Sequence, residues 1–180
     1  NGETYNLYSD GLRVYTTIDS RMQEYAEQAV YKHVVKYLQP AFNREIKGKK
    51  SAPYSGNLTM EQVKKILMRS VRQCERYRVL KESGATEEQI RKSFNTKTEM
   101  SVFTYHGDID TTMTPLDSIR YVKSYLRAGF MSMDPKTGAV KAYVGGLDYS
   151  HFMYDMAMGG RRQVGSTIKP FLYSLAMENG

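Results

Sequence analysis

The sequence of 180 residues is 41% hydrophobic and 25% charged, a composition typical of one moderate globular domain or of one domain with an appendage. It contains no run of about eighteen apolar residues and no cleavable leader, so these residues show neither a membrane span nor a secretory signal. A single cysteine, Cys74, excludes an internal disulfide. Its helical spacing from Leu67 and Val71 predicts a small buried side chain rather than a reactive thiol.

The net charge of +7 is concentrated in one part of the chain. Residues 36–99 contain 15 Lys and Arg against seven Asp and Glu, whereas the remaining residues nearly balance. A basic segment suits nucleic acid, an anionic membrane surface or an acidic polymer. No zinc spacing, aromatic strand motif or arginine-rich tract favours nucleic acid. Solvated helix faces are therefore the preferred interpretation, and no nucleic acid partner is expected.

The first half of the chain is predicted to be mostly helical. Alternating β-branched and aromatic residues indicate an early strand, and apolar residues at a period of 3.6 indicate amphipathic helices after it. Thr59 with Gln62 is typical of a capping box, and Gly84 is a suitable helix stop. The predicted elements are a strand at 12–18, helices at 19–39, 59–82 and 86–94, and a loop at 40–58.

The second half is predicted to mix strands and helices. Asp134 to Gly138 forms a turn signal between two apolar runs, which indicates a β-hairpin. The other predicted elements are a strand at 100–105, a helix from Thr114 that stops at Gly129, a loop at 147–165, and a last helix from Ser166 toward Asn179. Helices gathered in blocks beside antiparallel strands predict an α+β fold.

The stretch GGRRQVGSTIKPFLYSL, residues 159–175, places Ser166 and Lys169 one helical turn apart. A serine hydroxyl becomes a good nucleophile when a neighbouring base removes its proton, and a lysine serves as that base when its pKa is strongly lowered. Pro170 is tolerated only near a helix N-terminus, so Ser166 should begin the helix, and Gly165 allows the sharp turn into it. By itself, the bare S-x-x-K tetrad is better explained as a capping serine beside a solvated lysine.

Three longer blocks give that tetrad a context. GLRVYTTIDSRMQEYAEQAV resembles the junction segment of class A penicillin-binding proteins, between glycosyltransferase and transpeptidase domains. GFMSMDPKTGAVKAYVGG resembles the opening hairpin of their transpeptidase domain, and RRQVGSTIKPFLYSLAMENG resembles its active-site serine helix. The order and spacing of the blocks also fit this family.

The resemblance implies a peptidoglycan synthase with D,D-transpeptidase activity, in which Ser166 is the nucleophile and Lys169 the general base. Stem peptides ending in D-Ala-D-Ala and β-lactam antibiotics would be its ligands, and no cofactor is implied. It also implies a glycosyltransferase domain and an anchor in the cytoplasmic membrane upstream, with this portion outside that membrane. We expect residues 1–112 to be the mostly helical junction region and 113–180 the first part of the transpeptidase domain, in the penicillin-binding or serine β-lactamase-like fold.

The family's two further motifs, S-x-N and K-T-G, are expected after the serine helix and do not follow Ser166 in these residues. The same strings occur upstream at Ser55–Asn57, Ser93–Asn95 and Lys136–Gly138, where a loop, a helix end and a turn explain them better. We therefore expect the 180 residues by themselves not to catalyse transpeptidation. Four polar residues before Ser166 are candidates for lining a cleft, but a helix-entry or structural role is the preferred interpretation of each. They are Asp155, Arg161, Arg162 and Gln163.

Three other interpretations remain open at this point. One is that residues 20–100 are a helical docking platform for cell-wall synthesis partners, with no catalysis of their own. Another is that the basic segment binds an acidic polymer or nucleic acid, which a steep salt dependence of binding would support. A serine β-lactamase also uses S-x-x-K, although the junction block argues against it. No metal site is expected, because the histidines have no metal-ligand spacing: His33, His106 and His151.

Overall fold

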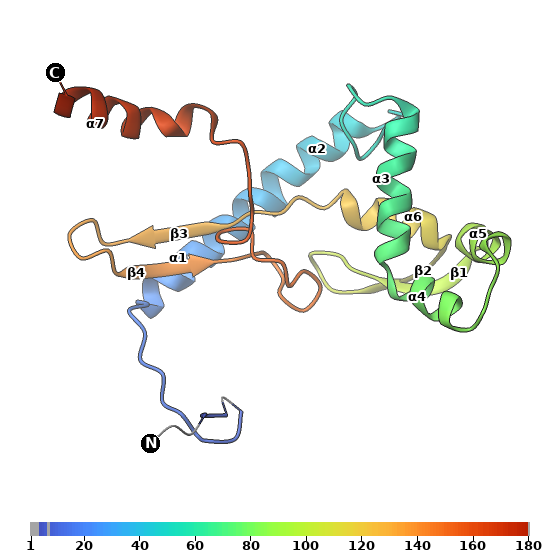
Figure 1. Cartoon of the computed structure of the whole chain (residues 1–180), viewed down its shortest axis with the longest axis horizontal. Coiled ribbons are helices and arrows are strands. Elements are labelled where there is room, and N and C mark those ends of the chain that lie inside the picture. The colour runs from blue at the N-terminus through green and yellow to red at the C-terminus, as the bar shows by residue number, and fades with distance from the viewer. Residues whose placement is uncertain (1–3, 7, 180) are drawn as a thin grey trace.

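One long continuous helix is the longest element of the structure (Figure 1). The computed structural model describes residues 4–6 and 8–179, so the outermost limits of the two expected domains, Asn1 and Gly180, lie outside the described residues. The helix comprises α1 (Ser20–Tyr31), the π-helical η1 (Lys32–Leu38) and α2 (Gln39–Ile46). Asp19 begins it by accepting hydrogen bonds from the backbone N–H groups of Arg21 and Met22.

Two of the sequence predictions for this region are wrong. The segment 12–18 is not a strand: it runs exposed, and its contacts with the sheet edge are one hydrogen bond from the Thr17 hydroxyl to Val140 O and, just after it, one from Asp19 N to Lys141 O. The predicted loop at 40–58 begins with helix, which continues to Ile46. Pro40 lies directly after the π-helical turns, where the hydrogen-bond pattern changes and a missing N–H group is tolerated.

Four shorter helices form the second group of elements. They are α3 (Met60–Gln73), α4 (Glu75–Glu82), α5 (Glu87–Asn95) and α6 (Pro115–Lys123). Capping boxes begin α3 at Thr59 and α5 at Thr86, as the sequence predicts for local side chains. The predicted helix 59–82 is divided at Cys74, whose backbone is extended, and α6 ends at Lys123 instead of approaching Gly129.

Two small antiparallel sheets complete the architecture. The first pairs β1 (Thr98–Val102) with β2 (Ile109–Met113), a strand that sequence analysis missed; β1 itself starts two residues before the predicted strand. The second pairs β3 (Phe130–Met133) with β4 (Val140–Val144) and confirms the predicted hairpin. Mixed helices and small sheets confirm the α+β prediction at this coarse level.

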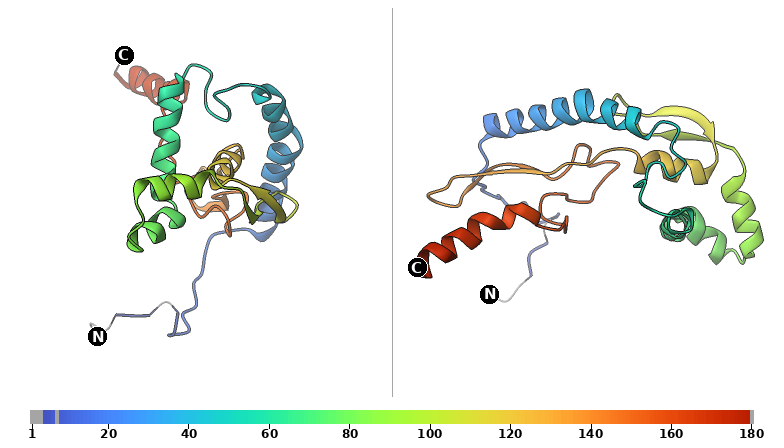
Figure 2. Two further views of the ribbon diagram at one scale, coloured as in Figure 1. Left: turned by 90° about the vertical axis from the view of Figure 1, so that its right-hand side faces the viewer. Right: turned by 90° about the horizontal axis from the view of Figure 1, so that it is seen from above.

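The hydrophobic core is divided between two places. The hairpin lies against α1 along the long helix, where Ala26 packs with Ala142 and Val144 (Figure 2). The second cluster joins α3, α5 and α6 around Val71, Ile90 and Phe94. Two separate clusters leave each end of the molecule with its own small core, so the contacts between the ends decide how they are held together.

The side chain of Gln23 attaches α1 to the hairpin edge as a neighbouring strand would. Its amide nitrogen donates to Tyr143 O at 2.8 Å, and its amide oxygen accepts from Tyr143 N at 2.7 Å. The single side chain therefore satisfies both backbone groups of one residue at the open edge of β4.

Gln39, at the junction of η1 and α2, attaches the same helix to the segment that follows α6. Its amide nitrogen donates to Ser124 O at 2.9 Å, and its amide oxygen accepts from Leu126 N at 2.8 Å and from the Tyr105 hydroxyl at 3.2 Å. Gln39 is buried, with 6% of its surface exposed. These bonds fix the chain at the point where it leaves the helical group and enters the hairpin.

Candidate functional site

The predicted nucleophile and base lie where the sequence analysis placed the last helix. Ser166 is in a 3-10 turn, η2 (Gly165–Ile168), and Lys169 begins α7 (Lys169–Asn179). Gly165 has a φ of +52°, a left-handed conformation that suits glycine and turns the chain sharply into the serine. The 3-10 turn continues directly into the 11-residue α7, and the Lys169 backbone N–H donates to Ser166 O, so Ser166 lies at the positive end of the helix dipole.

The side chains of Ser166 and Lys169 share no hydrogen bond within the described part of the chain, and both are exposed. Helix α7 stands apart from the hairpin and from the long helix (Figure 1). Its apolar residues are exposed, including Phe171 at 72% and Met177 at 84%. The structure therefore places the two residues on adjoining turns but does not assemble a site around them.

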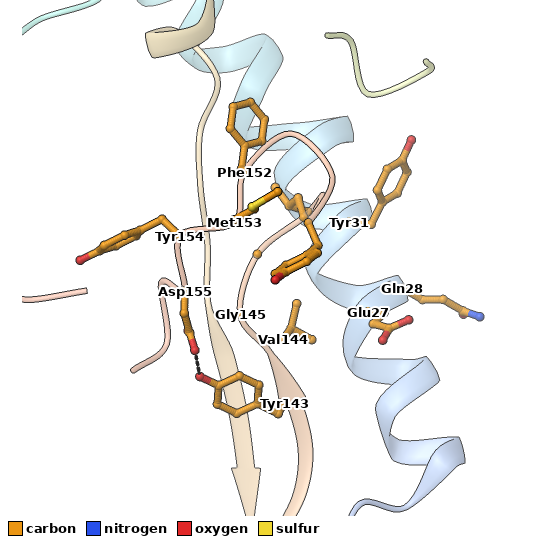
Figure 3. A pocket seen from close by; sticks show the side chains of 13 residues that line it. Glu27, Gln28, Tyr31, Tyr143, Val144, Gly145, Phe152, Met153, Tyr154 and Asp155 are labelled. Carbon is orange, nitrogen blue, oxygen red and sulfur yellow. Dashed lines mark hydrogen bonds between the residues drawn. The ribbon is translucent and has the colours of Figure 1, made fainter. Parts of the chain in front are cut away.

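A pocket of about 660 Å³ lies beside the loop that leads to Ser166 (Figure 3). Residues from α1, from the end of β4 and from the loop 147–155 surround it. Figure 3 shows Tyr31 and Glu27 on the α1 side, with Tyr143 and Asp155 together beyond the strand. The pocket is separate from Ser166, which does not line it.

Asp155 organises the loop rather than the pocket. Its carboxylate accepts hydrogen bonds from the Tyr143 hydroxyl and from the backbone N–H groups of Ala157 and Met158. The hydrogen bond from Tyr143 is the main cause that lowers the pKa of Asp155, and the same bond raises the pKa of Tyr143. The structural role expected for Asp155 fits this geometry. The two arginines of the expected helix entry are exposed, as is the amide next to them: Arg161, Arg162 and Gln163.

His151 joins the same loop to the β1–β2 connection, a contact that sequence analysis missed. Its Nδ1 lies 2.9 Å from the Asp148 carboxylate and its Nε2 lies 3.1 Å from that of Asp108. The hydrogen bond to Asp148 and then that to Asp108 raise the pKa of His151. Bonds from Ser150 and from His151 lower the pKa of Asp148 to about 2. No sequence signal indicated this, because Asp108 is 43 residues away.

An aromatic cluster surrounds this junction. The Phe103 ring contacts four others, at centroid distances of 4.9 Å for His151 and Phe152, 5.1 Å for Tyr125 and 5.5 Å for Tyr105. Burial raises the pKa of Tyr105 to about 12 and also raises that of Tyr125. These ring contacts, which are mostly edge-to-face, hold the loop before Ser166 against the β1–β2 connection and the residues that follow α6.

The three strings that imitate family motifs have structural roles. In Lys136–Gly138, Gly138 has a φ of +72° and the hairpin turn is closed by Gly138 N donating to Asp134 O at 2.9 Å. Ser93–Asn95 ends α5, where the Asn95 side chain donates to Arg91 O. Ser55–Asn57 lies in the loop before α3. The predicted positions of the three strings, in a turn, at a helix end and in a loop, are confirmed.

Three further features concern metal sites, the cysteine and membrane-spanning helices. No group of three His, Cys, Asp or Glu side chains suited to a metal ion occurs among residues 4–6 and 8–179. Cys74 is half-buried, and its thiol donates to Val71 O at 2.9 Å at the end of α3. Within that described range no helix combines the length and the apolar character needed to cross a membrane.

In a comparison with known protein families, two consecutive parts of the chain match two different domain families. Residues 49–126 match the penicillin-binding protein middle domain, and residues 128–180 match the penicillin-binding protein transpeptidase domain. The chain therefore belongs to the penicillin-binding proteins. The two matches meet close to the residues that Gln39 holds, whereas the expected domain limit between residues 112 and 113 stays a prediction.

The relatives agree on one kind of penicillin-binding protein. Penicillin-binding protein 1A of Escherichia coli (strain K12) is 30% identical over 99% of this chain and 25% of its own length. Penicillin-binding protein 1A of Neisseria flavescens is 49% identical over 31% of this chain, and that of Pseudomonas aeruginosa is 43% identical over 30%, each over 7% of the relative. The chain thus spans about a quarter or less of these relatives. No solved structure matches it.

Proposed function

We propose that the protein carrying this chain is a serine D,D-transpeptidase that crosslinks peptidoglycan stem peptides. The transpeptidase-domain match over residues 128–180, which contains Ser166 and Lys169 at the beginning of a helix, is the observation that carries the proposal. Membership of the class A enzymes, with a glycosyltransferase domain and a membrane anchor elsewhere and this portion outside the cytoplasmic membrane, belongs to the same proposal.

In the proposed reaction Ser166 Oγ attacks the carbonyl carbon of the penultimate D-Ala, while Lys169 Nζ accepts the hydroxyl proton. The tetrahedral intermediate collapses, the peptide bond to the terminal D-Ala breaks, and the departing amine takes up the proton held by Lys169. An amine of a neighbouring stem peptide then attacks the ester carbonyl and forms the crosslink; the ester bond to Ser166 breaks, and a proton of the attacking amine restores the Ser166 hydroxyl. A β-lactam would acylate Ser166 in the same way and leave it stably modified.

The surroundings of Ser166 favour this chemistry in one respect. The backbone N–H group of Ser166 itself, at the start of the 3-10 turn, is the kind of donor that stabilises an oxyanion, which is usually the largest electrostatic contribution to such catalysis. The apolar residues of α7 are exposed and are distributed around the helix rather than along one side. Packing of α7 against further protein would bring Lys169 into a less polar setting, where a neutral amine is favoured.

The proposal is tested by intact-mass measurement after incubation with a penicillin. The protein used continues this chain through the remainder of a transpeptidase domain, beside Ser166→Ala and Lys169→Ala variants. The expected result is one covalent adduct on the unmodified protein, none on Ser166→Ala and strongly slowed formation on Lys169→Ala. An adduct that persists in Ser166→Ala would refute the assignment of the nucleophile, and equal rates in Lys169→Ala would refute the assignment of the base.

A further inference from the structure

An apolar groove of about 660 Å³ lies among α3, α5 and α6, at the opposite end of the molecule from α7 (Figure 1). Helices α3 and α5 each pack on α6, and the groove runs between them. Its floor consists of buried side chains on two of the helices: Val63, Leu67 and Val71 from α3, and Ile90 and Phe94 from α5. Val71, Ile90 and Phe94 also form the second core cluster.

The groove walls follow helical periodicity. The α3 side is lined at spacings of three and four residues from Met60 to Val71, and the α5 side likewise from Glu87 to Asn95. Met60 and Met68 are 55% and 39% exposed on the α3 wall. Methionine side chains adapt to irregular apolar partners, which makes them frequent at surfaces that accept a helix.

The rim of the groove is positively charged. Lys64 from α3 and Arg91 from α5 line it, and neither forms an ion pair within the described residues. Arg120 from α6 is paired with Asp117 at 3.1 Å. The rim's acidic residue, Glu87, is engaged by Lys81 at 2.7 Å. Two cations without an ion-pair partner among the described residues therefore line an apolar groove, one on α3 and one on α5.

We propose that this groove binds an amphipathic acidic helix of a partner protein. The apolar floor would receive side chains at positions i, i+3, i+4 and i+7 of the incoming helix, and flanking carboxylates would pair with Lys64 and Arg91. The 14 residues of α3 span roughly 21 Å, which matches about four turns of a partner. The backbone groups of α3 and α5 are engaged within their own helices, so an added strand has no edge to join here.

The test uses the 180-residue chain and two synthetic helical peptides of 16 residues. Both carry leucine at the four anchor positions, and the other positions hold Glu with Ala in one peptide and Lys with Ala in the other. Fluorescence anisotropy measures binding at about 0.1 M salt. The expected result is at least tenfold tighter binding of the acidic peptide, weakened as the salt concentration rises.

Two charge-matched double variants assign the site. In Lys64→Glu with Arg91→Glu, the preference should reverse toward the basic peptide. In Lys32→Glu with Lys36→Glu, the same charge change is made at exposed positions of η1, and the preference should stay as in the unmodified chain. Met68→Asp places a charge on the apolar wall and should weaken the acidic peptide at least tenfold. Circular dichroism confirms that each variant is folded.

Several outcomes would overturn the proposal. Equal binding of the two peptides, no binding up to millimolar concentration, or an unchanged preference in Lys64→Glu with Arg91→Glu would each do so. Light scattering that shows a dimer lost in Met68→Asp would assign the groove to a second copy. Tighter binding of phosphatidylglycerol vesicles or of a DNA duplex, lost in the same double variant, would assign it to a membrane or to nucleic acid. None of these outcomes depends on acylation of Ser166.

Discussion

Replacing Gln39 by leucine tests the attachment of the long helix to the rest of the molecule. Leucine keeps the approximate size and the helix propensity of glutamine but removes the side-chain amide, which supplies both a hydrogen-bond donor and an acceptor. The change leaves two backbone groups, Ser124 O and Leu126 N, without their partner. The Tyr105 hydroxyl keeps its second bond, to Leu126 O at 2.9 Å, and contributes little to the loss.

The expected cost follows from these two groups. A buried polar group that loses its hydrogen bond costs about 1–3 kcal/mol, so two give about 4 kcal/mol at the middle of that range. Ser124 and Leu126 are half-buried, and partial hydration reduces this to about 2 kcal/mol. Urea unfolding followed by circular dichroism should then show a midpoint lower by about 1 M for a slope of about 2 kcal/mol per molar.

A matched control lies on the same helix. Gln28 is exposed, and its amide donates to Glu24 at 3.0 Å within its own helix. Gln28→Leu should therefore change the free energy of unfolding by less than about 0.5 kcal/mol. If Gln39→Leu also lowers the free energy of unfolding by less than about 0.5 kcal/mol, the reasoning is refuted, because the hydrogen bonds of Gln39 would then contribute no net stability.

Three further predictions concern other contacts. His151 has a raised pKa, so its contact with Asp108 stabilises the fold fully below about pH 6.5 and is lost as the pH rises through the folded-state pKa; Asp108→Asn should lower the NMR titration midpoint of His151, and an unchanged midpoint would contradict this. The buried Tyr54 hydroxyl has no hydrogen-bond partner among the described residues, so Tyr54→Phe should raise the free energy of unfolding by about 1 kcal/mol, and a lower melting temperature would show that the hydroxyl is satisfied. Phe94 is 3% exposed in the second core cluster, and Phe94→Ala should cost about 3–5 kcal/mol in urea unfolding, whereas Phe171→Ala on exposed α7 should cost less than about 0.5; similar losses would contradict the packing described for α7.

Local signals in the sequence predicted local features well. The capping boxes at Thr59 and Thr86 and the turn closed by Gly138 depend on residues three or four positions apart, so their spacing can be read directly. The strand expected at 12–18 failed for the opposite reason. An alternating pattern indicates only that a segment suits a sheet, and here no partner strand pairs with it.

The missed features depend on distant partners. Gln23 meets Tyr143 across 120 positions and Gln39 meets Leu126 across 87, and neither glutamine differs in the sequence from an exposed one. For the candidate site, sequence predicted the turn into Ser166, which Gly165 allows, and a helix that begins at Ser166; in the structure Ser166 lies in a 3-10 turn and the α-helix begins at Lys169. The pairing of serine with lysine stays a prediction, because it depends on how α7 packs.

Gln23 and Gln39, which each hold a distant segment against the long helix as a clamp, have a geometric consequence. They lie 16 positions apart on one uninterrupted helix, about 24 Å along its axis, and each holds a different part of the protein. The helix therefore acts as a spacer with a defined phase as well as a defined length. Inserting one residue between them would rotate one clamp by about 100° relative to the other, so both attachments could not persist.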